Sequence, residues 1–163
     1  MAEMRQSEQE IVVEQVLDAP RELVWKASTD PELISQWWGS KSLTTTVEEM
    51  DVRPGGMWRI VQRDAEGNEY AFHGVYHEVS PPERIVGTFE FEGMPGHIML
   101  ETDTFEDLSG GRTKMTYRMV FQSVEDRDAV LQSGVQGELV EGVDHLAELL
   151  EDLKAQKPAA PAP

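Results

Sequence analysis

Two carboxylates are the residues of this chain whose types and spacing most directly suggest chemistry. Glu101 and Asp103 lie two positions apart in residues 97–106, a stretch whose alternation is typical of a β-strand, so both side chains share the face that carries Phe105. If that face is internal, burial raises the pKa of Glu101 or Asp103 and makes it a candidate acid, base or ligand anchor. The alternative is a bulge in the strand that turns both carboxylates to solvent, since carboxylates are rarely buried without a partner.

Other polar residues are candidates to complete such a site. A buried carboxylate needs a partner, and the sequence offers Arg53, Arg59 and Arg118 without choosing among them. A ligand with one polar end would need an anchor of the same kind. The residues expected to supply it are Glu101, Asp103, Arg59 and Tyr117.

A larger group of aromatic, methionine and branched residues is expected to line a pocket. Any one of them would more readily be explained as ordinary core, because aromatic residues and methionines dominate cores. Taken together they suit a pocket for a bulky apolar or aromatic ligand, since methionine adapts to irregular shapes. The predicted ligand-binding set is Trp37, Trp38, Trp58, Arg59, Tyr76, Met99, Glu101, Asp103, Phe105, Met115, Tyr117, Met119, Val135 and Leu139.

The tryptophan pair before Gly39 has a structural and a functional interpretation. We expect Trp37 to pack against the sheet, with Gly39 ending a short helix. Trp38 either packs in the same way or lies at the mouth of the pocket, where it would control entry.

Histidine chemistry is less strongly indicated. His73 and His77 share a strand face but lie ~13 Å apart at ~3.3 Å per residue, too far for one metal ion. His97 and His145 complete no ligand spacing, and His145 is expected on the exposed, acidic side of a helix. Nucleophile-elbow, phosphate-loop and dinucleotide motifs are missing from the sequence. We therefore expect no metal, no cofactor and no assigned catalytic residue.

The elements that must position these residues can be predicted from periodicity and from glycine and proline positions. A first strand ends before Ala19-Pro20, and two short helices follow, the second capped by Asp30 with Pro31 at its first position. Six strands come next, over residues 43–52, 57–63, 69–79, 84–92, 97–106 and 113–121. The pattern predicts an antiparallel α+β fold with one sheet face covered.

Residues 124–153 are expected to form one long helix over that face. An apolar stripe recurs at close to the helical period, and acidic residues occupy the other side. Gly134, Gly137 and Gly142 each cost ~1 kcal/mol of helix propensity relative to Ala, so the first half is expected to be looser than the second. That half is predicted to be a movable wall of the pocket.

Composition limits the classes of function. The 163 residues include 31 acidic and 14 basic side chains, a formal net charge of −17, which opposes binding to nucleic acid or anionic lipid. The absence of cysteine excludes disulfides and thiolate ligands. With no apolar run near the ~20 residues that span a bilayer and no signal-peptide core, a cytoplasmic protein is expected, either a monomer or a weak homodimer.

The domain organisation is simple. One domain is expected over residues 10–153, preceded by a flexible start at residues 1–9. Residues 154–163, rich in proline and alanine, are expected to be disordered.

Six ordered motifs carry a resemblance to a known family. They are Ala19-Pro20-Arg21-Glu22-Leu23-Val24-Trp25, Thr29-Asp30-Pro31-Glu32-Leu33, Trp37-Trp38-Gly39, Val52-Arg53-Pro54-Gly55-Gly56, Pro81-Pro82-Glu83-Arg84-Ile85-Val86 and Gly111-Arg112-Thr113. The chain resembles the SRPBCC (START-like) superfamily and, within it, single-domain bacterial members of the family of activators of the heat-shock-protein-90 ATPase. The resemblance implies a helix-grip fold, in which a curved seven-stranded sheet grips the C-terminal helix around a deep cavity.

The resemblance leaves the function open. Our first expectation is binding of a small hydrophobic or amphipathic molecule in the cavity, without catalysis. The alternatives are a chaperone-linked regulator, although we expect no counterpart of the eukaryotic activator's separate N-terminal domain here, and an enzyme acting on a cyclic or polyketide-like substrate. Two departures from relatives would alter the cavity: Leu139 stands where many have a large aromatic residue, and Asp103 where they have an apolar one.

Overall fold

The computed structural model of the chain describes residues 8–156. The elements in order are β1 Glu10–Leu17, α1 Arg21–Thr29, α2 Pro31–Trp37, β2 Thr44–Met50, β3 Met57–Arg63, β4 Glu69–Ser80, β5 Arg84–Phe91, β6 Ile98–Leu108, β7 Arg112–Val120, α3 Val124–Gln132 and α4 Val135–Ala155. The strands form one seven-stranded sheet in the order β1-β7-β6-β5-β4-β3-β2, antiparallel at every pairing. The predicted α+β fold with two short helices after the first strand is confirmed.

The two short helices are held by local caps and by one buried indole. Asp30 caps α2, since its Oδ1 accepts a hydrogen bond from the backbone N–H of Glu32 at 3.0 Å, and Pro31 occupies the first position as expected. Trp37 Nε1 donates to the Ala27 carbonyl at 2.9 Å, which ties α2 to α1. The side chain of Trp37 is buried, so it has the structural contact expected for this residue.

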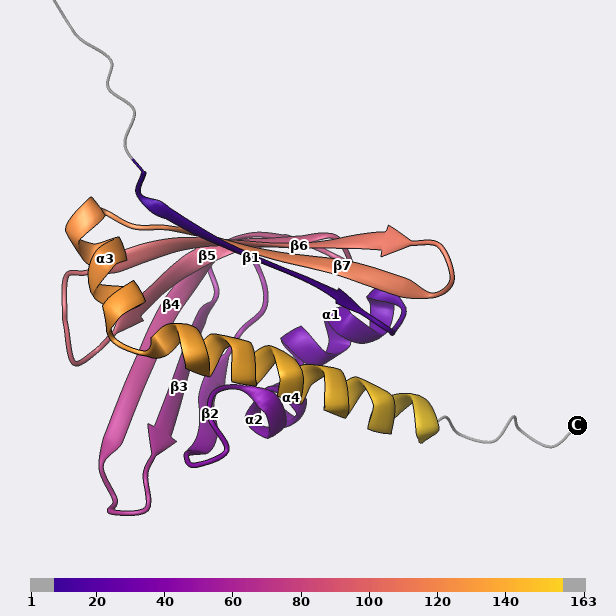
Figure 1. Ribbon diagram of the computed structural model, residues 1–163, viewed down its shortest axis with the longest axis horizontal. Coiled ribbons are helices and arrows are strands. Elements are labelled where there is room, and N and C mark those ends of the chain that lie inside the picture. Colours follow the sequence, from indigo (N-terminus) through magenta and orange to yellow (C-terminus); the bar gives the residue numbers. More distant parts are fainter. Residues whose placement is uncertain (1–7, 157–163) are drawn as a thin grey trace, which may run out of the picture.

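One face of the curved sheet is covered by helices. Figure 1 shows α4 running across the concave face, with α1 and α2 beside it. The main hydrophobic core lies between them, where Leu146 and Leu150 of α4 pack in one cluster with Phe105, Met115 and Tyr117 of the sheet. Alternation along the strands therefore assigns every second residue of β6 and β7 to this face. No helix within residues 8–156 is long and apolar enough to cross a membrane.

The prediction of one continuous C-terminal helix is wrong. Gly134 adopts φ of +82°, a left-handed conformation that glycine reaches without steric cost, and it ends α3 and starts α4 in a new direction. Figure 1 shows the two helices meeting at an angle. Helix propensity and periodicity could not reveal the break, because an isolated glycine inside a periodic pattern is usually tolerated.

Both ends of the domain extend slightly beyond the expected limits. Phe121 N donates to the Gln9 carbonyl at 2.7 Å, so ordered contacts begin before residue 10. At the other end α4 continues through Lys154 to Ala155, and Lys154 pairs with Glu151 at 2.7 Å. The rest of the predicted flexible segments, residues 1–7 and 157–163, lies outside the described residues.

We expect the two halves of α4 to differ in amide hydrogen exchange. Val143, Leu146 and Leu150 are 5%, 0% and 1% exposed, whereas Val140 in the first half is 54% exposed. Local opening needs less free energy where few apolar contacts break, so amides of residues 137–141 should exchange at least ~10-fold faster than those of residues 145–150. Peptide-resolved mass spectrometry measures this difference. Equal protection of the two halves would contradict the idea of a movable wall.

Candidate functional site

The centre of the concave face carries the two carboxylates that the sequence singles out. Glu101 of β6 is paired with Gly87 of β5, and Asp103 with Tyr117 of β7. Phe105, next on the same face of β6, is 2% exposed and belongs to the core. Neither pairing of β6 contains a register shift, so the bulge that would have turned both carboxylates to solvent is absent. Both side chains lie on the internal face.

The electrostatics of the pair follow from burial without a cation. Burial raises the pKa of Asp103 well above its ordinary value, and the neighbouring charge of Glu101 raises it further. Burial also raises the pKa of Glu101, partly offset by a hydrogen bond from Asp103. Each carboxyl group thus holds its proton to a higher pH than an exposed carboxyl group does, and the ionisation of one affects that of the other.

The carboxyl pair lies on the concave side of the curved sheet, a region that is called the recess below. Glu101 and Asp103 are half-buried there, and burial is the largest cause of both pKa shifts. Asp103 Oδ1 has no solvent contact and no hydrogen-bond partner, which is rare for a buried polar atom.

Two tyrosines lie within electrostatic reach of the pair. Burial raises the pKa of Tyr76 and of Tyr117, and the charges of Asp103 and Glu101 raise both further. Both phenols thus stay protonated and can donate hydrogen bonds. Gly87 is paired with Tyr76 on one side and Glu101 on the other, and a Cβ there would lie 2.9 Å from the Val75 carbonyl oxygen, so the strands approach closely at this position.

Beside the pair, five aromatic rings form a cluster on the concave face. Ring centroids are 5.3 Å apart for Trp38 and Phe72, 5.6 Å for Trp58 and Phe89, and 5.1 Å for Phe72 and Phe91. All five rings belong to residues that are only half-buried. The cluster is therefore an apolar part of the concave face that is not fully buried.

Sequence reasoning missed the three phenylalanines of this cluster. Phe89 and Phe91 are two residues apart in a predicted strand, and this spacing was a signal that they share a face. Which face of the sheet these two phenylalanines share depended on the pairing of β5 with β4. In β4, Gly74 lies under the Trp58 indole. A Cβ on Gly74 would be 2.6 Å from Trp58 Nε1 and 1.9 Å from the Thr88 carbonyl, so the close packing at this position requires glycine.

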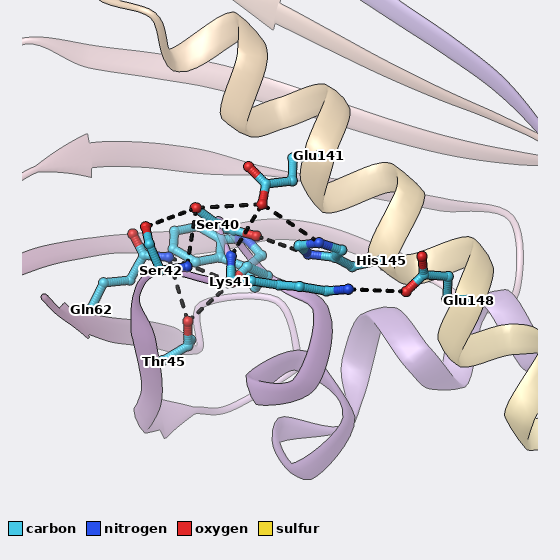
Figure 2. Close-up of polar contacts among 10 residues, drawn as sticks. Ser40, Lys41, Ser42, Thr45, Gln62, Glu141, His145 and Glu148 are labelled. Carbon is cyan, nitrogen blue, oxygen red and sulfur yellow. Dashed lines mark hydrogen bonds and ion pairs between the residues drawn. The ribbon is translucent and has the colours of Figure 1, made fainter. Parts of the chain in front are cut away.

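A polar network fixes Trp38 and the segment after it. The Trp38 carbonyl accepts hydrogen bonds from Thr45 Oγ1 at 3.0 Å and from Gln62 Nε2 at 3.5 Å. Across from them, Glu141 of α4 accepts from the backbone N–H of Lys41 at 3.3 Å (Figure 2). The backbone that positions the Trp38 indole is thus tied both to the sheet and to α4.

The expectation that His145 is exposed is wrong. His145 is 9% exposed, and Nδ1 lies 3.2 Å from the Gly39 carbonyl, so Nδ1 must carry the donated proton (Figure 2). The side of α4 that carries His145 faces the connection from α2 to β2 rather than solvent. The connection also packs against Gly142, where a Cβ would lie at an ordinary van der Waals distance of 3.5 Å from Gly39 N.

The structure separates Arg59 from the other predicted site residues. Trp58 and Arg59 are neighbours in β3, so they point to opposite faces, and Trp58 takes the concave one. On the other face, Arg59 pairs with Glu48 and, at 2.8 Å, with Glu92. The Arg59 guanidinium lowers the pKa of Glu92 to about 2.

The other two candidate arginines are engaged elsewhere as well. Arg118 pairs with Glu10 at 2.8 Å and Arg53 with Asp51 at 2.7 Å. The expectation that one of the three arginines would neutralise Glu101 or Asp103 is therefore wrong.

The remaining predicted residues are divided between the core and a small pocket. Phe105 and Met115 fill the main core, while Met99 and Met119 form a second cluster on which Leu139 packs. Leu139 also borders a pocket of about 200 Å³ with Ile11, Val12, Val13, Val130, Leu131 and Val140. The side chain of Val135 lies outside the described part of the structure.

Two other features lie away from this site. A larger, open hollow of about 470 Å³ is lined by Glu8, Gln9, Glu10, Val120 and Arg127 at the start of β1, away from the carboxyl pair. Within the described chain, no three His, Asp or Glu side chains are grouped so that they could hold a metal ion.

The curved antiparallel sheet, the helix pair after its first strand and the helix across its concave recess define a helix-grip, START-like protein. The chain belongs to the SRPBCC-type family described as Activator of Hsp90 ATPase homolog 1-like protein, whose family model matches residues 18–151. The predicted resemblance is confirmed. No protein with a curated description matches the chain.

Solved bacterial structures show the same fold. A protein from Chromobacterium violaceum is 29% identical, with a TM-score of 0.75 over 87% of this chain and 97% of its own. One from Nitrosomonas europaea is 26% identical, with a TM-score of 0.81 over 93% and 99%. One from Rhodobacter sphaeroides is 25% identical, with a TM-score of 0.83 over 92% and 97%.

The carboxyl pair predicts a specific dependence of stability on pH. The folded protein holds the Asp103 proton to a higher pH than the unfolded chain does, so ionisation of Asp103 lowers the free energy of unfolding as the pH rises. The Asp103→Asn side chain cannot ionise, so the free energy of unfolding of this variant is not lowered in this way as the pH rises. The variant should therefore gain stability relative to wild type between about pH 4, near the unfolded pKa, and pH 8.

Urea unfolding of both proteins across this range measures the difference. Asp107→Asn is the matched control, because Asp107 is an exposed carboxylate on the same strand. The stability of the control relative to wild type should stay nearly constant with pH. A D103N difference that is equally constant would contradict the assignment.

Proposed function

We propose that this protein binds a small hydrophobic or amphipathic molecule in the recess between the concave sheet face and α4. One observation carries the proposal, the five half-buried aromatic rings that α4 leaves partly uncovered. Water-accessible aromatic surface gathered on an internal concave face is typical of ligand sites, which combine an apolar wall with a few polar groups. Membership in the family is consistent with this function.

The polar groups near the wall support the same proposal. Asp103 lacks a partner for Oδ1, and Tyr117 is a protonated donor held close to it. A ligand with an apolar body and one polar end would cover the aromatic surface and satisfy these groups together. Leu139, which packs between the second cluster and the small pocket, would adjust to the ligand from the α4 side.

A second candidate function is acid–base catalysis on a cyclic substrate. It is favoured by the pair itself, because Asp103 as acid and Glu101 as base have pKa values displaced by burial in a recess. Turnover of a bound compound that disappears in Asp103→Asn, with binding retained, would distinguish this function from simple binding. The chaperone-linked alternative derives from the family description, and no contact or charge of the described residues favours it.

A ligand screen by thermal unfolding tests the proposal. At a concentration of 100 times Kd, a ligand stabilises by ~2.7 kcal/mol, which raises Tm by roughly 5–10 °C for a chain of this size. We expect at least one neutral apolar or aromatic compound of a diverse panel to do so. Failure of the whole panel to shift the wild-type Tm would contradict the proposed function.

The matched variants are Leu139→Trp and Glu138→Trp. Leu139 is half-buried against Met99 and Met119, so an indole there should fill the space over the recess and weaken ligand binding at least ~10-fold, as expected from lost access. Glu138 is exposed on α4, and an indole there should leave the ligand-induced shift unchanged.

A further inference from the structure

We propose that the recess selects ligands that carry a protonated amine, with the ammonium group on Glu101 and Asp103 and the apolar body on the aromatic cluster. This inference rests on the proposed function, since it names the class of molecule that the same recess would take. Three observations carry it: an unsatisfied carboxyl oxygen, the absence of a neighbouring cation, and the spacing between the carboxyl pair and the aromatic rings.

The first observation concerns Asp103 itself. Its Oδ1 is shielded from solvent and makes no hydrogen bond, although Oδ atoms accept bonds readily. A buried acceptor without a partner is destabilising, so an atom of this kind in a native protein calls for a partner, and a bound ligand is one way to supply it. The missing partner is a hydrogen-bond donor, and an ammonium group carries three N–H donors.

The second observation is that none of the cationic side chains among the described residues 8–156 pairs with Glu101 or Asp103. The titratable groups that face it are Tyr76 of β4 and Tyr117 of β7, with Asp51 further along, beyond Tyr76. From α4 the packed side chains are the apolar Val143 and Leu146. None of the ion pairs among residues 8–156 includes Glu101 or Asp103.

The sign of the electrostatic potential at the carboxyl pair determines whether cations, neutral molecules or anions are favoured as ligands. Two carboxyls in a poorly solvated recess favour a cation and repel an anion, and the net charge of −17 acts in the same direction at longer range. A neutral acceptor could take a hydrogen bond from the Asp103 proton but would gain nothing from the charge on Glu101. A cation gains from both groups.

The third observation is the distance from the pair to the rings. Gly87 faces Glu101, and Phe89 follows two residues later on the same face of β5, ~7 Å along the strand. An amine attached to a fused two-ring aromatic body is about as long as that distance, so the nitrogen can contact the pair while the far end of the rings contacts Phe89. The rings of Phe89 and Trp58, with centroids 5.6 Å apart, also offer π-faces that attract a cation at close range.

Binding of this kind is coupled to release of one proton. The free pair shares the Asp103 proton, and an ammonium ion that bonds to both groups stabilises two carboxylates, so the proton leaves to solvent while no covalent bond changes. Affinity should therefore increase with pH until the free pair is itself ionised, and it should fall again where the amine loses its own proton.

The test uses three probes of one shape and different charge: 1-naphthylmethylamine, 1-naphthylmethanol and 1-naphthoic acid. Isothermal titration calorimetry at pH 7.5 should show the amine binding about 10- to 100-fold more tightly than the alcohol, as expected for a charge-assisted bond, with the acid weakest. Titrations in buffers of different ionisation enthalpy should show proton release on binding of the amine alone.

Two variants test the assignment to the pair. Asp103→Asn and Glu101→Gln should each weaken amine binding about 10-fold or more while changing alcohol binding less than about 3-fold. Glu106→Gln is the matched control, since Glu106 is an exposed carboxylate on the opposite face of β6, and it should leave the preference intact. Circular dichroism verifies that each variant is folded.

The outcomes separate the two proposals. If the alcohol binds as tightly as the amine, or if both variants keep the preference for the amine, the inference is overturned and the proposed function stands. If none of the three probes binds the wild-type protein, the inference is overturned. The proposed function is then also contradicted for apolar ligands of the size of naphthalene. Preference for the amine that depends on Glu101 and Asp103 supports both.

Discussion

The structure depends on how much of a concave apolar sheet face its helices can cover. The second half of α4, with Leu146 and Leu150, seals the core over Phe105 and Met115. The first half begins at the turn of Gly134 and leaves the aromatic cluster partly open. At ~25 cal/mol per Å², a ring residue of about 200 Å² that keeps up to about a third of its surface exposed forfeits at most roughly 1–2 kcal/mol of burial free energy. A loss of this size over five rings is understandable if a ligand completes the cover.

The carboxyl pair adds a second destabilising feature at the same place. Taking Glu101 and Asp103 out of water without a cation raises the pKa of both and leaves Asp103 Oδ1 unpaired. Apolar residues at these positions of β6 would pack with Phe105 and Tyr117 at lower free energy. The half-buried rings and the unpaired acid therefore lie on the same concave face, and under the proposed function one bound molecule with an apolar body and a polar end would relieve both.

The rigid and movable parts of the recess have different origins. On one side, His145 and Glu141 tie α4 to the segment at Gly39 and Lys41, and this holds the Trp38 backbone in place (Figure 2). On the other side, the junction of α3 and α4 relies on few buried contacts. Leu139 of α4 borders the small pocket of about 200 Å³, whereas Asp103 lies on β6 beside Tyr117.

Several features of the protein were determined locally and could be predicted from the sequence alone. Alternation placed Glu101, Asp103 and Phe105 on one face of a strand, and Asp30 with Pro31 marked the start of a helix. These signals depend on neighbours within a few residues, where strand pleat and capping geometry are fixed. The order of the elements, and with it the helix-grip fold, followed from the same local signals together with the family motifs.

The composition of the site was decided only by tertiary structure. Whether the face of Glu101 is internal depends on pairing with β5 and β7, and the rings that join Trp38 come from β4 and β5. Arg59 was expected beside Trp58, although neighbours in a strand must diverge, and it found carboxylates on the other face. His145 took its partner from a backbone carbonyl more than one hundred residues away in sequence. Contacts between distant segments are set by packing of whole elements, and no local pattern encodes them.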